Sequence, residues 1–295
     1  MSDEARSEAR ESRASRAFYT YLPAHLRRPT CNTLVQMGRT HPRVIAHRGY
    51  AADNAENTVA AMRAAASDDC TDTIEIDARA TSDNRVIVFH DDDLSRLTDA
   101  PPAVSDTPVW ELSYDEISGY TIGDSDEPIP LLTEVLAAIP DSVGVNLELK
   151  HPGREGLTFG AVDDDDARIA AADRWRPLVE RALDVATDTD HDLLVSSFYE
   201  GALAATRGCE PEVSVAPLVT DDVATGSILA DRYDAAAIHP PLDLVVESNL
   251  VARAHDADRR VNAWTVTTAE EGRTLAAAGV DGLIADTSGV IPGLV

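Results

Sequence analysis

The stretches TIEID at residues 73–77 and VNLELK at residues 145–150 alternate apolar with polar side chains. A period of two is typical of a β-strand, in which successive side chains point to opposite faces of a sheet. It places Glu75 and Asp77 together on one face of the first strand, and Glu148 on one face of the second. The isoleucines and leucines fall on the other face, where they would pack against helices. The two stretches therefore indicate strands with one polar side and one helix-covered side.

Short β-type runs alternate with alanine-rich helical stretches from Val44 onward. The expected strands cover residues 44–47, 73–78, 86–89, 144–149, 193–198, 213–219, 235–239, 261–266 and 282–285. The expected helices include residues 58–67, 168–186, 244–258 and 268–278. This alternation is the signature of βα repeats around a parallel sheet.

Nine expected strands are one too many for an eight-stranded barrel. The polar turn TSDNR at residues 81–85 resolves the excess, because Asp-Asn at its tip favours a two-residue hairpin loop. Asp77 would then lie opposite His90, and residues 86–89 would be the returning arm of the second strand. The sequence therefore predicts an α/β fold, a (β/α)8 TIM barrel with a small insertion after this hairpin.

The insertion is expected at about residues 91–141, a stretch with six prolines and one helix-like piece at residues 131–138. Residues 1–40 are expected to be an N-terminal extension, partly disordered or helical. The barrel would then occupy residues 41–295.

Acidic residues dominate the charge of this 295-residue chain, with 52 Asp+Glu against 25 Lys+Arg and a formal net charge of −27. The lack of a basic footprint excludes nucleic acid as a partner and excludes a polybasic membrane anchor. No apolar run approaches the ~18 residues of a spanning helix, so no stable membrane insertion is expected. Hydrated carboxylates keep a protein soluble where salt screens their repulsion. The composition therefore indicates a halophilic, cytoplasmic protein from a high-salt interior.

Three acids, Glu75, Asp77 and Glu148, would converge inside the barrel near the carboxyl ends of their strands, where the catalytic groups of such barrels lie. Inward acids on neighbouring strands repel one another. One hard divalent cation, Mg²⁺ or Ca²⁺, removes that cost by binding carboxylate oxygens. The alternative is that the acids pair with arginines at the barrel mouth.

Two histidines, His47 and His90, are expected at strand ends beside this cluster. Imidazoles with a pKa near 6.5 serve as general base and general acid at neutral pH, although a lone strand-end histidine is more often structural. Arg48 and Lys150, the only lysine of the chain, add cationic donors suited to a phosphate anion. Asp91 is expected as a turn residue, with orientation of a histidine as the alternative.

The motifs in this order resemble the glycerophosphodiester phosphodiesterase family, part of the phosphatidylinositol phospholipase C-like superfamily, over about residues 44–290. The motifs are HRG at 47–49, ENT at 56–58, EID at 75–77, the run from Thr81 to Asp91, LELK at 147–150, SSF at 196–198, AWTV at 263–266 and DGLIAD at 281–286. Ala55, Asn84 and Thr287 depart from the family pattern of proline, glycine and proline. These changes affect loop geometry and leave every expected reactive group in place.

The resemblance implies a phosphodiesterase barrel that hydrolyses small-molecule glycerophosphodiesters to a glycerol phosphate and an alcohol, with one divalent cation. One histidine would deprotonate the glycerol 2-hydroxyl, the other would protonate the leaving alcohol, and water would then open a cyclic phosphate. The implied roles are metal ligation by Glu75, Asp77 and Glu148, acid–base catalysis by His47 and His90, phosphate binding by Arg48 and Lys150, a glycerol wall at Trp264, and support of the first loop by Glu56. The alternative for Trp264 is an aromatic side chain buried in the barrel core.

Other functions remain open from the residues alone. A Schiff-base aldolase also places a lysine at a barrel strand end, which would be Lys150 here, but it needs neither the acids nor the histidines. A non-catalytic binding barrel of the same family would be expected to lack at least one reactive residue. A lipase acting on intact phospholipid would need exposed apolar loops at the mouth, whereas the 91–141 segment is acidic. The sequence leaves the alcohol, the native metal and the oligomeric state open.

Overall fold

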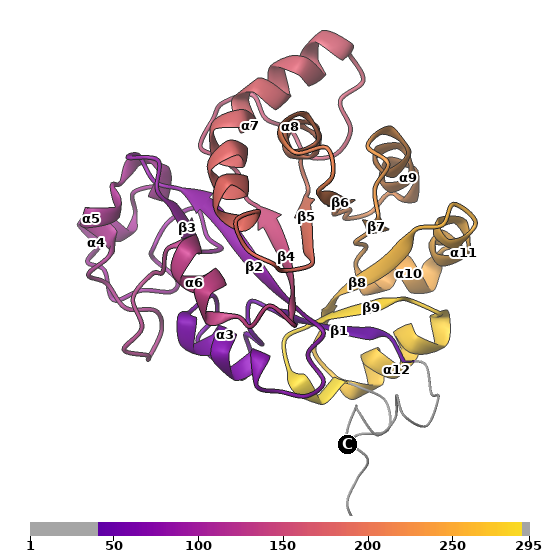
Figure 1. Cartoon of the computed structure of the whole chain (residues 1–295), viewed down its shortest axis with the longest axis horizontal. Coiled ribbons are helices and arrows are strands. Elements are labelled where there is room, and N and C mark those ends of the chain that lie inside the picture. Colours follow the sequence, from indigo (N-terminus) through magenta and orange to yellow (C-terminus); the bar gives the residue numbers. More distant parts are fainter. Residues whose placement is uncertain (1–40, 291–295) are drawn as a thin grey trace, which may run out of the picture. The chain divides into compact units, whose positions relative to one another are not determined.

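Eight parallel strands form a barrel in this computed structural model, which describes residues 41–290 (Figure 1). Around the barrel the strands follow the order β6, β5, β4, β2, β1, β9, β8, β7. A parallel bridge between Leu218 and His239, just past β6 and β7, joins the two ends of this order. The strands are β1 (Arg43–His47), β2 (Thr73–Ala80), β4 (Gly144–Leu149), β5 (Leu193–Ser197), β6 (Ser214–Pro217), β7 (Ala237–Ile238), β8 (Arg260–Val266) and β9 (Gly282–Ala285).

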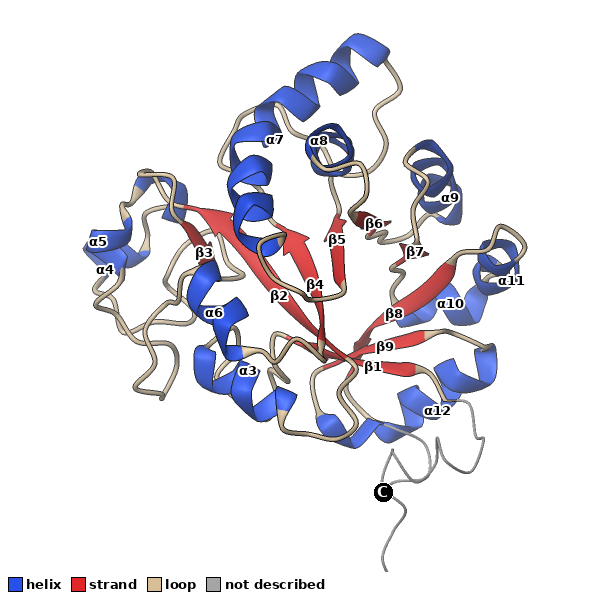
Figure 2. Cartoon of the chain, viewed as in Figure 1, coloured by secondary structure: helices blue, strands red, loops and turns tan. Residues whose placement is uncertain are grey.

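Helices cover the outside of the barrel, as Figure 2 shows. They pack on the outward, apolar side chains of the strands, such as Ile74, Ile76 and Leu147, which are fully buried. The predicted TIM barrel is therefore confirmed. The helices between barrel strands are α3 (Val59–Ala66), α6 (Leu132–Ala138), α7 (Asp165–Ala186), α8 (Glu200–Cys209), α9 (Val223–Arg232), α10 (Leu242–Glu247), α11 (Leu250–His255) and α12 (Ala269–Ala278), and the 3-10 turn η3 (Ser288–Val290) follows β9.

Local capping explains where several helices begin and end. The Thr58 side chain accepts a hydrogen bond from the Ala61 amide at the start of α3, and the Thr268 hydroxyl caps α12 in the same way. Gly279 ends α12 with a left-handed φ of 86°. The single helix expected over residues 244–258 is instead two short helices, α10 and α11.

The hairpin after β2 forms as expected, with β3 (Val86–Val88) antiparallel to β2, but its register differs by one residue. Phe89 donates its amide to the Asp77 carbonyl at 2.9 Å, so Phe89 and not His90 lies opposite Asp77. The cause is the loop, which holds three residues and ends at Asn84 in the left-handed conformation, φ 58°. A type I turn followed by a left-handed residue is the usual three-residue hairpin loop, whereas the prediction assumed two residues.

The segment between β3 and β4 lies beside the barrel and builds a small core of its own (Figure 1). Before α6 it contains three short helices, α4 (Pro102–Ser105), η2 (Val109–Glu111) and α5 (Tyr114–Ile117), where the sequence predicted none. Each is only one turn long, too short to leave a periodic pattern. The buried cluster comprises Ile87, Phe89, Leu94, Val109, Leu112, Ile117, Ile122 and Ile129.

The expected N-terminal extension, residues 1–40, lies outside the described residues. Within residues 41–290, none of the helices is both long enough and apolar enough to cross a membrane.

Candidate active site

A cavity of about 150 Å³ opens at the carboxyl ends of the barrel strands. In a TIM barrel this is the end where strand-terminal side chains and the βα loops converge. The structure brings to this place all eight residues that the sequence analysis gave a metal-binding, acid–base or substrate-binding role. Asp77 lies fully buried directly behind the cavity wall. The other seven line the cavity: His47, Arg48, Glu75, His90, Glu148, Lys150 and Trp264.

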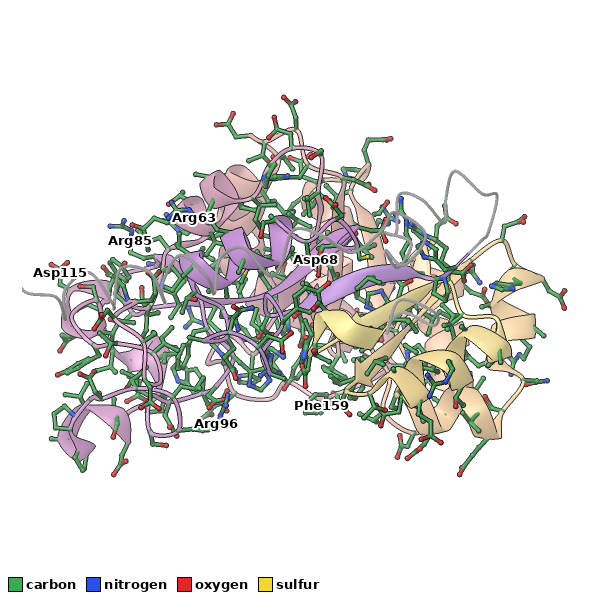
Figure 3. All side chains as sticks on the ribbon, turned by 90° about the horizontal axis from the view of Figure 1, so that it is seen from below. Arg63, Asp68, Arg85, Arg96, Asp115 and Phe159 are labelled. Carbon is green, nitrogen blue, oxygen red and sulfur yellow. The ribbon has the colours of Figure 1, made fainter. Side chains whose placement is uncertain are left out.

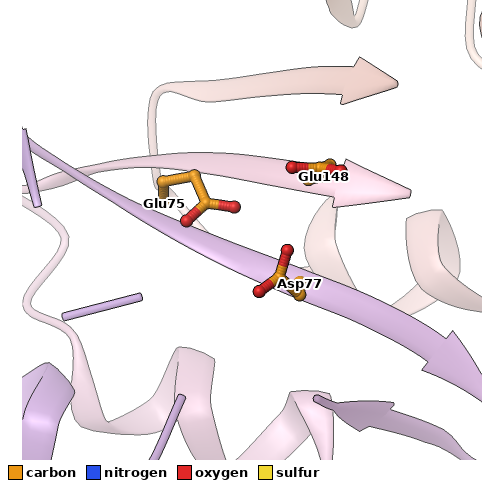
Figure 4. Close-up of side chains that lie close together, drawn as sticks. All are labelled: Glu75, Asp77 and Glu148. Atoms are coloured by element: carbon orange, nitrogen blue, oxygen red, sulfur yellow. The ribbon is translucent and has the colours of Figure 1, made fainter. Parts of the chain in front are cut away.

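Three buried carboxylates, those of Glu75, Asp77 and Glu148, form the floor of the site (Figure 4). Asp77 on β2 is the register partner of Glu148 on β4, and Glu75 lies two residues earlier on the same face of β2. One oxygen from each of the three lies within 4.8 Å of the other two. The period-two pattern therefore did place these acids on one inward face.

Burial and mutual repulsion set the protonation of this cluster. The pKa of Glu75 is raised well above its usual range, first because the carboxyl is buried and then because Asp77 and Glu148 are close. Burial also acts to raise the pKa of Asp77, but the adjacent cations Lys150 and Arg48 outweigh it and lower that pKa. The cluster thus separates into one carboxyl that resists ionisation and one that is held as a carboxylate.

The same cluster fits a divalent cation on the evidence of its free oxygens. Among residues 41–290, Glu75 Oε1 is buried without a hydrogen-bond partner. Within the same described residues, Asp77 Oδ1 and Glu148 Oε1 each form an ion pair with the ammonium of Lys150. Three converging carboxylate oxygens are the donor set that Mg²⁺ and Ca²⁺ take. Buried oxygens left without such a partner are costly, so the arrangement favours a cation.

Each of the two histidines is oriented by a carboxylate. His47 Nδ1 lies 2.6 Å from Asp286 Oδ1, and His90 Nδ1 lies 2.6 Å from Asp91 Oδ1. A carboxylate only accepts hydrogen bonds, so Nδ1–H is the donor in each pair. Nε2 of each ring is therefore the nitrogen that these two contacts leave available.

The loop after β1 folds back to bring Arg48 onto Asp77, with Arg48 Nε 3.2 Å from Asp77 Oδ2. Glu56 holds the other end of the guanidinium, at 2.9 Å from Nη1. Arg48 and Gly49 both have left-handed backbones, φ 52° and 75°. A Cβ at Gly49 would lie 2.9 Å from the Ala61 Cβ, so only glycine fits there. Support of this loop by Glu56 was predicted, and the contact is present.

Arg96, labelled in Figure 3, comes from the segment beside the barrel. Its guanidinium contacts both supporting acids, Asp91 and Glu56. Its Nε and Nη2 lie 2.6 and 2.9 Å from the two Asp91 oxygens, and Nη2 also lies 2.9 Å from Glu56 Oε1. Asp91 orients His90, and Glu56 holds Arg48. The Arg96 guanidinium therefore links the carboxylate that orients His90 to the carboxylate that holds Arg48.

The sequence did not reveal two of these contacts. Asp286 follows β9 and meets His47 only because β9 pairs with β1 when the barrel closes. The one available signal was that the DGLIAD motif ends on an acid at a strand end. Arg96 lies in a segment without a clear pattern, and nothing in the sequence singled it out.

Trp264 on β8 forms an aromatic wall of the cavity together with Phe198, which follows β5. The two rings meet edge to face, with centroids 5.6 Å apart. The indole Nε1 donates to the His239 carbonyl at 2.8 Å, which holds the ring in place. The structure therefore places Trp264 at the cavity and not in the barrel core alone.

Comparison with known proteins agrees with this geometry. The model of the glycerophosphoryl diester phosphodiesterase family matches residues 47–290. A glycerophosphodiester phosphodiesterase of Bacillus altitudinis is 28% identical over 260 residues, which cover 83% of this chain and 94% of the relative.

Solved structures show the same barrel. A phosphodiesterase of Oleispira antarctica, in complex with the product sn-glycerol-3-phosphate, superimposes with a TM-score of 0.69 at 25% identity, covering 83% of this chain and 93% of its own. A structure from Silicibacter pomeroyi gives a TM-score of 0.70 at 23% identity, with coverages of 85% and 92%, and so agrees in fold. The chain belongs to the glycerophosphoryl diester phosphodiesterase family.

Proposed function

We propose that this protein hydrolyses glycerophosphodiesters to a glycerol phosphate and an alcohol, using one divalent cation and the acid–base pair His47 and His90. The observation that carries the proposal is the grouping of two carboxylate-oriented histidines with a buried carboxylate triad in one cavity. The Oleispira relative holds sn-glycerol-3-phosphate, the class of product proposed here.

The acid–base step uses Nε2 of the two imidazoles. One ring takes the proton from the attacking hydroxyl as the new P–O bond forms. The other ring gives a proton to the leaving alcohol as its P–O bond breaks. The attacking group in the first stage is the glycerol 2-hydroxyl, which gives a cyclic phosphate, and water opens that ring with the two histidine roles reversed. The carboxylates of Asp286 and Asp91 keep each ring in the tautomer that this exchange needs.

Charge stabilisation comes from the floor and the rim of the cavity. Glu75, Asp77 and Glu148 would hold Mg²⁺ or Ca²⁺, which would neutralise charge on phosphate oxygens and orient the glycerol. Arg48 and Lys150 both line the cavity, and their donors suit phosphate oxygens. Trp264 offers an apolar surface to the glycerol carbons.

The aldolase alternative is disfavoured by the surroundings of Lys150. A Schiff-base lysine needs a neutral amine, which requires a lowered pKa. Burial would lower the pKa of Lys150, but Asp77 and Glu148 raise it above its usual value. The ammonium is therefore held charged and is not a nucleophile in this state.

A coupled assay for released glycerol phosphate tests the proposal over several diesters, with EDTA and with added Mg²⁺ or Ca²⁺. We expect release that EDTA abolishes and that a metal restores. His47→Ala and His90→Ala should each abolish turnover while leaving the fold intact by circular dichroism. No release from any diester under any metal condition would defeat the proposal and would favour a non-catalytic binding barrel.

We also propose a cytoplasmic, high-salt setting, which the net charge of −27 supports. Self-repulsion among so many carboxylates weakens as salt screens it. The melting temperature should therefore rise between low and molar salt. Equal stability at both salt concentrations would contradict this setting.

A further inference from the structure

Arg79 is a buried arginine near the carboxyl end of β2 that the proposed mechanism does not use. It continues the alternation of Glu75 and Asp77, so its side chain lies on the same face of β2 as those two acids. Only 4% of the residue is exposed. Burial of a guanidinium is costly unless the group is paired and hydrogen-bonded. The partners of Arg79 therefore show what its burial achieves.

The guanidinium of Arg79 donates to two main-chain carbonyls. Its Nε and Nη2 lie 2.9 and 2.7 Å from the carbonyl oxygen of His90, and its Nη1 lies 3.2 Å from the carbonyl oxygen of His151. Nη2 also forms an ion pair with Asp92 at 2.7 Å. Because the donors of an arginine form a rigid planar fork, these contacts hold the two carbonyls in one relative position.

Both carbonyls lie just past the ends of strands that flank β2. Ala78 on β2 is paired with β3 on one edge and with β4 on the other, and Figure 1 shows β2 between these two strands. His90 comes two residues after the end of β3, and His151 comes two residues after the end of β4. The side chain of Arg79 therefore links the two flanking chains at the point where regular strand pairing has ended.

His90 depends on this link more than Lys150 does. The His90 imidazole lines the cavity at the carboxyl ends of the barrel strands, and two of the three Arg79 hydrogen bonds go to the His90 carbonyl. Lys150, which precedes the second carbonyl, has anchors of its own. Its amide donates to a carbonyl of β2 at 3.1 Å, and its ammonium pairs with two carboxylates of the acidic cluster. Loss of the guanidinium should therefore displace His90 and leave Lys150 in place.

We propose that Arg79 is a positioning residue for the acid–base step, and that it holds the main chain of His90 where Nε2 reaches the phosphodiester. This inference rests on the proposed function. Asp91 fixes the rotation of the imidazole, and Arg79 fixes the main chain from which the imidazole projects. Within residues 41–290, Arg79 is not one of the residues that line the cavity, so it acts through His90 and not on the substrate. A misplacement of about 1 Å in a reacting group can cost on the order of 100-fold in rate.

Steady-state kinetics of Arg79→Met and Arg79→Lys test the inference, with Mg²⁺ and the diester that the wild type hydrolyses best. Arg79→Met keeps a long side chain but has no donor, and it should lower kcat about 10- to 100-fold. KM should stay within about two-fold of the wild-type value, because Lys150 keeps its own contacts. Arg79→Lys keeps the charge without the planar fork, so it should recover only part of kcat.

Arg207→Met is the matched control, because Arg207 also uses its guanidinium to hold main-chain carbonyls. These carbonyls come just before β6 and β7, at the opposite end of the barrel from the cavity. The variant should lose stability and keep the wild-type kcat. The carbonyls that accept from Arg207 belong to Pro211, Val213, Tyr233 and Asp234.

A second readout needs no substrate. In protein labelled with ¹⁵N-histidine, the Nδ1–H signal of His90 should broaden in Arg79→Met, because the main chain that carries the ring is no longer held. The Nδ1–H signal of His47 should stay as in the wild type. Both signals should be unchanged in Arg207→Met.

A wild-type kcat in Arg79→Met, an equal loss of kcat in Arg207→Met, or an unchanged His90 signal would each overturn the role of Arg79 and leave the proposed function intact. The rise in melting temperature on adding Mg²⁺ should be the same in Arg79→Met and the wild type. Its loss would trace the defect to the acidic cluster and would also overturn the inference. If Arg79→Met fails to fold by circular dichroism, Arg79→Lys decides, and a wild-type kcat in that variant would contradict the role. If the wild type hydrolyses no diester, the proposed function fails, and a broadened His90 signal in Arg79→Met would still support the link between the two residues.

Discussion

Without metal, we expect the Glu75→Gln variant to be more stable than the wild type. When a divalent cation is added, we expect the wild type to be the more stable of the two. The glutamine keeps the size of the side chain and one carbonyl oxygen, which can still accept the 3.0 Å hydrogen bond from the Arg48 amide. It removes the charge that faces two other carboxylates. At an effective dielectric constant of about 20, two unit charges within 4.8 Å of each other repel by about 3 kcal/mol or more. The nearby cations Arg48 and Lys150 offset part of this repulsion.

Without metal, we expect Glu75→Gln to raise the free energy of unfolding by about 1 kcal/mol or more, equivalent to about 2–4 °C in melting temperature. The gain should depend on pH. Because the folded-state pKa of Glu75 is raised, the wild type is penalised only as pH rises above the unfolded-state value, ~4.3. The advantage of the variant should therefore be absent in acid, grow as pH rises through the raised pKa, and then level off.

With metal bound, the wild type should be more stable than Glu75→Gln. A cation at about 100 times its dissociation constant stabilises the folded state by about 2.7 kcal/mol. That corresponds to a rise of about 5–10 °C for the wild type. The variant lacks one of three anionic ligands and should gain far less.

Thermal unfolding in EDTA, Mg²⁺ and Ca²⁺ at pH 8 measures both effects. Glu212→Gln, at an exposed position before β6, is the matched control and should follow the wild type in every condition. Equal metal-induced shifts in wild type and Glu75→Gln would refute the assignment of Glu75 as a ligand. A less stable variant in EDTA would refute the repulsion argument.

Three further expectations rest on side chains that support the site. Asp286→Asn should lower kcat by at least about two orders of magnitude with little change in KM, because the amide no longer fixes the tautomer of His47. Steady-state kinetics measure this, and a kcat near the wild-type value would contradict it. Arg96→Gln should lower kcat about ten-fold, because Asp91 loses the guanidinium that holds it in place. Arg96→Lys should recover part of this loss. If the role of Arg96 were purely structural, the variants would change stability and leave kcat unchanged. Burial, and then Arg260, lower the pKa of His239 to about 3, so wild-type stability should fall as pH drops below ~6.5, by up to about 1.4 kcal/mol per pH unit. His239→Gln should lack this part of the slope in denaturant unfolding at pH 7 and pH 5, and identical slopes would contradict it.

The strands and the inward acids were predictable because their signals are local. The alternation in residues 73–77 and 145–150 depends only on the two-residue period of an extended chain, and both stretches are strands with buried acids on one face. Strand ends were less predictable. The run expected over residues 235–239 contains a two-residue strand, β7, which pairs with β8 at Ala237 and Ile238. Beyond it the pairing continues only as isolated bridges, from His239 to Leu218 and from Pro241 to Trp264.

The predicted register of the β2–β3 hairpin was wrong, and the reason cannot be read from the local sequence. Asp83-Asn84 at the tip of the loop is compatible with two loop lengths. The three-residue loop prevails in a fold where Asp83 Oδ1 accepts from the Thr81 hydroxyl at 2.6 Å and from the Tyr114 amide at 3.0 Å. The second of these contacts comes from α5, outside the hairpin. A partner 31 residues away thus accompanies the loop conformation.

By itself the sequence determined the fold class, the approximate positions of the strands, and the eight side chains that meet at the cavity at their carboxyl ends, because periodicity and motif order are properties of the chain. Support by Glu56 was expected from the family resemblance, but only the tertiary structure assigned Asp286 and Arg96 to the groups that support the site. His47 meets Asp286, 239 residues later, because β1 pairs with β9 when the barrel closes. Arg96 bridges Glu56, which follows β1, and Asp91, which follows β3. These contacts join side chains from loops that follow different strands. Such loops come within contact distance only when the barrel has closed.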